Sequence, residues 1–280
     1  MKPTYFPRSL VALVVGTVAL LAATPAMAQG LIWSLPEDGT SIRYEGEYSE
    51  TLVRENDTVE LGPWIRHLTI SSVGTEMVDD PADPGKKIPA RWIELKVTTG
   101  RSRDGRLDPG PLGERIYKVL VPEAAVLGRE VDDDGIPVAY IPILRGYRKI
   151  GQGDVQQLSA PVLQIYPVIS LLRHYPQLQP STEPEETIRI GTDVVSARKF
   201  TGRFVMESRT SRSTNTGGLW RSDEVPFGLA KWTVTIVREQ KDAPDPRSAF
   251  KRYSEIRVQM QAVEIRTEDV RSELATPESG

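Results

Sequence analysis

The sequence of 280 residues contains no cysteine. Disulfides, thiolate metal sites and cysteine nucleophiles are therefore excluded, and stability must come from an apolar core. A bacterial lipid anchor is excluded too, because it is attached to a cysteine at the signal cleavage site. Histidine occurs only twice, as His67 and His174. Neither has a second His, Asp or Glu at the short spacing of a zinc site, so both are interpreted as ordinary structural or surface histidines.

Motifs for nucleotides, nucleophilic serines and calcium are also missing. Gly151-Gln152-Gly153 lacks the third glycine of a dinucleotide loop, and neither a G-x-S-x-G elbow nor a phosphate-binding loop occurs. The acidic run Glu130–Gly135 fails as a calcium loop, because Ile141 stands where a bidentate glutamate is needed. The net charge of −3, without a basic patch, argues against nucleic acid. No cofactor is predicted, and a non-catalytic protein is favoured over an enzyme.

Residues 1–28 have the pattern of a bacterial secretory signal peptide. Lys2 and Arg8 precede the apolar run Ser9–Ala23, and Ala26-Met27-Ala28 forms a small-x-small cleavage site. The alternative is an uncleaved membrane anchor, for which the apolar run is short. We expect export to the periplasm or the extracellular space, with no stable membrane anchor after cleavage.

Most of the remaining sequence alternates apolar and polar residues with a period of two. The clearest cases are Ile93–Val97, Ala230–Ile236 and Ile256–Ala262. Each predicts a strand with one buried and one wet face, as in antiparallel sheets. Further strands are expected at Ile42–Tyr48, Leu68–Ile70, Tyr117–Val121, Ile188–Ile190 and Phe204–Met206, and loops at Pro81–Pro89 and Arg212–Gly218.

Two segments predict short helices that pack on this sheet. Pro122 can open a helix over 123–127, ended by Gly128. In the apolar segment Ala160–Leu178, Pro167 can open a helix over Val168–Tyr175, which Pro176 would end. The predicted fold is mainly β (β-rich α+β): one domain over 29–265, with a curved antiparallel sheet or half-barrel and one or two short helices, followed by a flexible tail over 266–280.

The stretch Leu219–Val237 carries the candidate site. Asp223–Gly228 has turn residues, and a loop symmetric about Pro226 would place Trp220 opposite Trp232. One interpretation is a structural hairpin. The other is an apolar, ligand-binding pocket wall made by Trp220, Phe227 and Trp232, with Tyr166 and Leu171 from the apolar segment as further candidate ligand-binding residues.

Trp220, Ser222, Val225, Pro226 and Gly228, together with the signal peptide and the apolar insert, resemble the LolA/LolB-like group of bacterial envelope proteins. The resemblance implies a curved half-barrel that wraps a helical lid and holds lipid or lipoprotein acyl chains. Two functions fit the whole sequence: non-catalytic binding of a hydrophobic ligand or lipid, and a structural or interaction module of the cell envelope with a fully packed core. A hydrolase would need carboxylates or a Ser/His pair to converge in a cleft.

Overall fold

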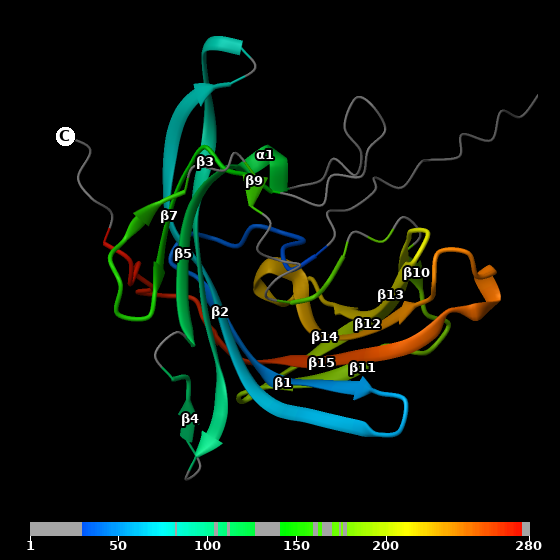
Figure 1. The fold of residues 1–280 in the computed structure, drawn as a ribbon. Helices are drawn as coiled ribbons and strands as arrows, with labels where there is room; N and C mark the ends of the chain where they lie inside the picture. The colour runs from blue at the N-terminus through cyan, green and yellow to red at the C-terminus, as the bar shows by residue number, and fades with distance from the viewer. Residues whose placement is uncertain are drawn as a thin grey trace, which may run out of the picture.

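The fold is an open, strongly curved antiparallel sheet (Figure 1). It is taken from a computed structural model, which describes residues 30–81, 83–103, 106–110, 113–126, 141–158, 162–163, 170–173, 175 and 178–275. The described chain forms one sheet of 13 strands in the order β10-β12-β13-β14-β15-β1-β2-β3-β5-β7-β8, with β11 beside β12 and β4 beside β3. The predicted fold class, mainly β with a curved antiparallel sheet, is confirmed, and the sheet is not closed.

Consecutive strands are mostly neighbours in the sheet, and β1 and β15 join its two halves. The strands of the first half are β1 (Ser41–Val53), β2 (Thr58–Asp80), β3 (Asp83–Arg103), β4 (Arg106–Asp108), β5 (Glu114–Pro122), β7 (Arg145–Ile150) and β8 (Gln156–Gln157). The strands of the second half are β10 (Gln179–Pro180), β11 (Glu186–Ile190), β12 (Asp193–Glu207), β13 (Ser211–Arg221), β14 (Leu229–Gln240) and β15 (Lys251–Arg266). A separate pair is formed by β6 (Ile141–Pro142) and β9 (Val162–Leu163).

The alternation in the sequence selects one face of the sheet as the core face. On the central strands β14, β15 and β1, this face carries Trp232, Met260 and Tyr44, all fully buried. The register sets Trp232 opposite Met260, and Gly46 of β1 lies beyond Met260. The predicted strands at 93–97, 230–236 and 256–262 are thereby confirmed, with the expected buried face in each.

Two expected loops are strands instead. β2 and β3 continue as a hairpin in which Met77 pairs with Pro89, because the other edge of β3 is open there and proline's missing N–H costs no ladder bond. Figure 1 shows this hairpin rising beyond the rest of the sheet. Residues 212–218 lie in β13, where Gly217 makes room for the buried ring of Tyr175. The glycine that suggested a turn thus serves packing.

The structure contains α1 (Glu123–Val126), which confirms the helix expected after Pro122. The helix expected over 168–175 is wrong in the part that can be described. Leu171 has a left-handed φ of 59°, which an α-helix does not allow, and residues 171–173 have no regular structure. Residues 171–173 therefore lie over the core face as irregular chain.

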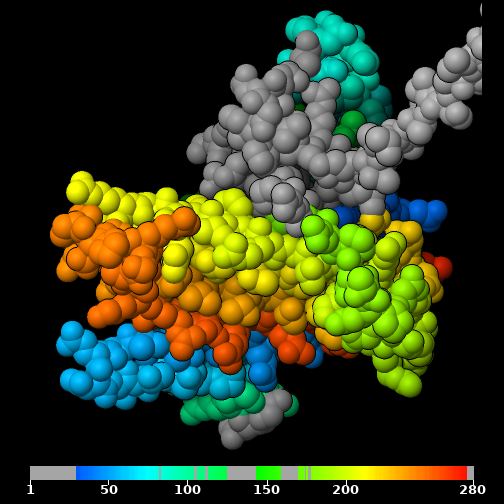
Figure 2. Space-filling model, turned by 90° about the vertical axis from the view of Figure 1, so that its right-hand side faces the viewer, coloured from blue at the N-terminus to red at the C-terminus, as the bar shows by residue number. Residues whose placement is uncertain are grey.

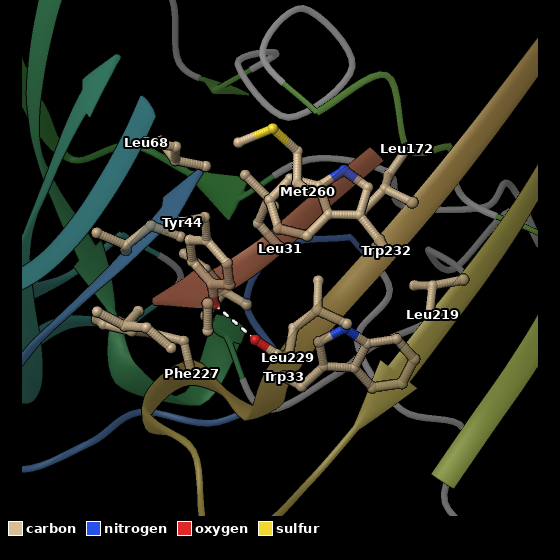
Figure 3. Packing of buried hydrophobic residues seen from close by; sticks show 14 of the residues in the cluster. Leu31, Trp33, Tyr44, Leu68, Leu172, Leu219, Phe227, Leu229, Trp232 and Met260 are labelled. Carbon is tan, nitrogen blue, oxygen red and sulfur yellow. Dashed lines mark hydrogen bonds between the residues drawn. The ribbon is translucent and has the colours of Figure 1, made fainter. Parts of the chain in front are cut away.

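Two irregular segments cover the core face instead of a helical lid. Leu31 and Ile32 precede β1 and are buried, and the backbone N–H of Trp33 donates to the carbonyl oxygen of Phe227 at 2.8 Å. The second segment contributes Leu172 and Tyr175, also buried. Figure 3 shows Leu31 and Leu172 beside the rings of Trp232 and Tyr44.

The start of the predicted flexible tail is docked on the opposite face of the sheet. The carboxylate of Glu94, buried in β3, accepts hydrogen bonds from the Ser272 hydroxyl at 2.6 Å and from the backbone N–H groups of Glu273 and Leu274 at 3.0 and 3.2 Å. Leu274 is only 2% exposed. Ser272–Leu274 are thereby held against the sheet, because a buried carboxylate needs such donors.

Candidate functional site

Trp232, Phe227 and Leu171, three of the predicted ligand-binding residues, lie within or against the packed core. The indole of Trp232 is fully buried, meets the Tyr44 ring edge-on at 4.9 Å between centroids, and donates to the carbonyl oxygen of Ser170 at 3.2 Å. Phe227 is also fully buried, and Leu171 packs against the cluster from its margin. Trp232 therefore contacts Ser170 directly, with no room for a ligand between them at this hydrogen bond.

Trp220 lies on the other face of the sheet, so the predicted Trp220–Trp232 pair is wrong. The register pairs Leu219 with Trp232 and Trp220 with Lys231, followed by a shift at Arg221. Adjacent residues of a strand point to opposite faces, so one step of register separates the two indoles. The Trp220 ring lies between the ammonium groups of Lys199, 5.3 Å away, and Lys231, 4.4 Å away.

The lysines around Trp220 form part of a structural clamp. Lys231 donates to the Glu186 carboxylate at 2.7 Å, and this hydrogen bond lowers the pKa of Glu186. The bond ties β11 to β14 across the outer face. Trp220 is thereby explained by cation–π packing.

The turn between β13 and β14 has Pro226 and Gly228 in the roles that the sequence predicts. Pro226 begins a 3-10 turn, η1 (Pro226–Gly228), and Gly228 has a positive φ of 79°, as expected for that position. A Cβ atom there would lie 2.9 Å from the Cβ of Trp33, so the close approach also requires glycine. These residues serve the turn and its contact with the N-terminal cover.

The remaining predictions fall on residues that the structure does not describe. They are the signal peptide 1–28, the acidic run 130–135, Tyr166 and His174. Among the described residues, no group of three or more His, Asp or Glu side chains is arranged to hold a metal ion.

A pocket that the sequence did not predict lies on the core face of β2, β3 and β5. Its volume is about 480 Å³, within the range of ligand-binding clefts. Arg66, Arg101 and Arg115 line it together with the rings of Trp64 and Tyr117, and we call this cleft the arginine pocket. The register carries Arg66 on the same face as Leu68, and Arg115 on the same face as Tyr117.

The charge of the arginine pocket is strongly one-sided. Among the described residues that line it, Asp108 is the one acid, and its carboxylate lies 3.8 Å from the guanidinium of Arg103 outside the pocket. Neither Arg101 nor Arg115 forms an ion pair with any residue that the structure describes. The described residues therefore leave the positive charges of Arg101 and Arg115 uncompensated.

Arg66 is held in place and partly desolvated. Its Nε donates to the Thr99 hydroxyl at 3.0 Å, and its guanidinium lies 5.4 Å from the centroid of the Tyr48 ring, which packs on Trp64 at 5.3 Å. The pKa of Arg66 is lowered from its ordinary value, first by burial and also by the positive charge of Arg115, while Tyr48 opposes this. A bound anion would offset both the desolvation of Arg66 and its repulsion from Arg115.

A second pocket of about 490 Å³ on the opposite face makes the contrast clear. Three of its four Lys and Arg side chains are paired: Arg43 with Glu264 at 2.9 Å, Lys96 with Glu273 at 2.6 Å, and Arg266 with Glu264 at 2.6 Å. The acids Glu94, Glu264, Glu268, Asp269 and Glu273 also line this pocket, so a similar volume here has no excess of positive charge to attract an anion. The arginine pocket is therefore the candidate functional site.

The sequence itself carries a signal for this pocket. Arg66 and Arg115 occupy positions of the alternating pattern that belong to the apolar face, next to Leu68 and Tyr117 in the period of two. A charge in such a position is unusual and indicates either a buried partner or a ligand.

Comparison of the sequence with protein-family models and with curated proteins finds no match. Within the part of the chain that the structure describes, there is no helix of the length and apolar character needed to span a membrane.

Proposed function

We propose that this protein binds, without catalysis, an anionic ligand with an apolar body in the arginine pocket. The observation that carries the proposal is the set of three arginines with one acid in a cleft of about 480 Å³ on the core face of the sheet. The proposal keeps the hydrophobic-ligand function expected from the sequence and moves its site from the hairpin to β2, β3 and β5.

The side chains divide the recognition between them. The guanidinium of Arg66 is already oriented by Thr99 and Tyr48, so little conformational freedom is lost when it binds an acid group. Arg115 and Arg101 add charge-assisted hydrogen bonds to a carboxylate or phosphate. Such bonds are stronger than hydrogen bonds between two neutral groups. Trp64, Tyr117 and the buried Val97 supply the apolar wall for the ligand body.

Arg115→Ala is expected to weaken binding of dodecyl phosphate by about ten-fold, because it removes one charge-assisted contact. Arg115 is exposed and makes no described ion pair, so the fold should be unaffected. Calorimetry below the critical micelle concentration measures the affinity. Arg43→Ala, in the pocket with paired cations, is the matched control and should leave the affinity unchanged.

Head-group chemistry separates this proposal from general detergent binding. Dodecyl trimethylammonium has the same chain and the opposite charge, and we expect it not to compete with dodecyl phosphate. Inorganic phosphate alone should bind weakly, because it does not use the rings. Equal affinity for the two detergents, or equal loss in both arginine variants, would contradict the proposal.

Export to the bacterial envelope belongs to the same proposal, with cleavage after Ala28. We expect the protein purified from its native compartment to begin at Gln29, as N-terminal sequencing would show. A mature chain that begins at Met1 would contradict export by cleavage. Membership in the LolA/LolB-like group stays a prediction.

An interaction module is the second candidate, and the packing of the core favours it. Trp232, Tyr44 and Phe227 leave no exposed surface beneath the cover. In this alternative, partners bind at the sheet edges.

A further inference from the structure

The last residues of β12 form an open edge of the sheet. Along 193–197 this edge is paired with β11, and at Phe200 and Thr201 it is paired with β10. Among the residues that the structure describes, no strand pairs with the edge from Gly202 to Glu207. Figure 2 shows β12 (yellow) along the margin of this layer opposite the β1–β2 hairpin (light blue).

Two hydrogen bonds show which backbone groups point to this open edge. The carbonyl of Lys199 accepts from the N–H of Ser181, on the β10 side, while the N–H of Ser208 donates to the carbonyl of Ser211, on the β13 side. Alternate residues of a strand direct their N–H and C=O groups to the same edge. Arg203, Val205 and Glu207 therefore present theirs to the open edge, where they are available to another strand.

The side chains at this edge are unusually apolar. Val205 is 36% exposed and Met206 is 50% exposed. Natural edge strands are normally protected by short length, proline or central lysines, because an open apolar edge pairs with other chains. The segment Arg203–Glu207 contains no proline and no lysine, and its three central residues are apolar.

The sequence of this edge is complementary to itself in the antiparallel direction. With Val205 opposite its own copy, Arg203 faces Glu207, and Phe204 faces Met206. In this register Arg203, Val205 and Glu207 are all hydrogen-bonded positions, so their backbone groups match as well. The charges at the two ends attract, although Glu207 also bonds Arg247 within its own chain at 2.8 Å.

We propose that two copies of this protein pair through the open edge of β12, antiparallel about a two-fold axis at Val205, to form a continuous sheet across the dimer. The interface is isologous, because each chain contributes the same residues. This inference goes beyond ligand binding: the arginine pocket lies on β2, β3 and β5, away from the edge, so either proposal can fail alone.

Sedimentation equilibrium of the purified protein over about a hundred-fold range of concentration measures the association, because a dimer grows with concentration. Val205→Lys should weaken the dimer by about ten-fold or more, since two ammonium groups then face each other across the axis. Val194→Lys is the matched control: Val194 is 52% exposed on the same strand, but its edge is already paired with β11. Circular dichroism confirms that both variants are folded.

Crosslinking gives an independent measurement. The chain has no cysteine, so Val205→Cys introduces a single thiol whose copy lies about 5.5 Å away between Cα atoms in a hydrogen-bonded pair. A short bis-maleimide should join two Val205→Cys chains and not two Val194→Cys chains. A monomer at every concentration overturns the proposal, and so does a dimer that Val205→Lys leaves as stable as before.

Discussion

Trp232→Ala is expected to lower the free energy of unfolding by about 3–5 kcal/mol, the range for truncating a buried aromatic side chain. Trp232 is fully buried, its ring contacts Tyr44 at 4.9 Å, and its Nε1 donates to Ser170 at 3.2 Å. The substitution removes apolar burial, leaves a cavity, and takes the donor from the Ser170 carbonyl. Urea denaturation monitored by far-ultraviolet circular dichroism measures the change.

Trp64→Ala is the matched control, because Trp64 is half-buried in the arginine pocket. It should cost only about 1–2 kcal/mol of stability, in proportion to its smaller burial, and should weaken binding of dodecyl phosphate. Trp232→Ala, in contrast, should leave that affinity unchanged in the folded fraction. A Trp232→Ala variant of normal stability that no longer binds would contradict both the packed core and the placement of the site.

The strands of this protein were predictable because the alternating pattern is long and regular. Along 230–236 and 256–262, every second residue is buried in the sheet, as expected from the period alone. Such an alternation buries all of its apolar residues only in a strand that has one face on the core and the other in solvent. The curved antiparallel sheet followed from several such segments in succession.

The contacts between strands were not predictable, because they depend on register. A shift of one residue between β13 and β14 puts Trp220 and Trp232 on opposite faces of the sheet. The arginine pocket depends on pairings of the same kind, which set Arg66 opposite Thr99 and Arg115 opposite Val97 on the shared neighbour β3. Neither pairing is encoded in a local motif, and both arise only when distant strands meet.

The cover of the core differs from the helix that the sequence predicts, since an apolar segment with a proline at its start is typical of a helix. The segment instead uses hydrogen bonds to the sheet: the Tyr175 hydroxyl donates to Asn215 at 2.8 Å, and the Asn215 amide donates to the Leu171 carbonyl at 2.9 Å. Burial raises the pKa of Tyr175, so this hydroxyl stays a donor throughout the neutral range. Asn215 had been assigned to a loop, although its polar side chain anchors the cover from within a strand.

Gly202→Ala is expected to destabilise the protein by about 1–3 kcal/mol through overpacking beneath this cover. A Cβ atom at residue 202 would lie 2.4 Å from Cγ of Tyr175 and 2.7 Å from its Cβ. These atoms lie near the backbone of Tyr175, so a simple rotation of the ring cannot relieve the clash. Chemical denaturation measures the loss, with Gly218→Ala as the control: its nearest contact is the Thr233 hydroxyl at 2.9 Å, a small side chain that can rotate away.

A double-mutant cycle tests whether the clash with Tyr175 is the cause. Tyr175→Ala alone should cost about 3–5 kcal/mol, as for other buried aromatic side chains. In that background Gly202→Ala should cost less than in the native protein by about 1 kcal/mol or more, because the new methyl group occupies space that the ring has left. If the two losses simply add, Tyr175 does not rest on Gly202, and the cover would be loose enough to admit a ligand. Strong coupling between them means that Tyr175 rests on Gly202 and closes the core face at this point.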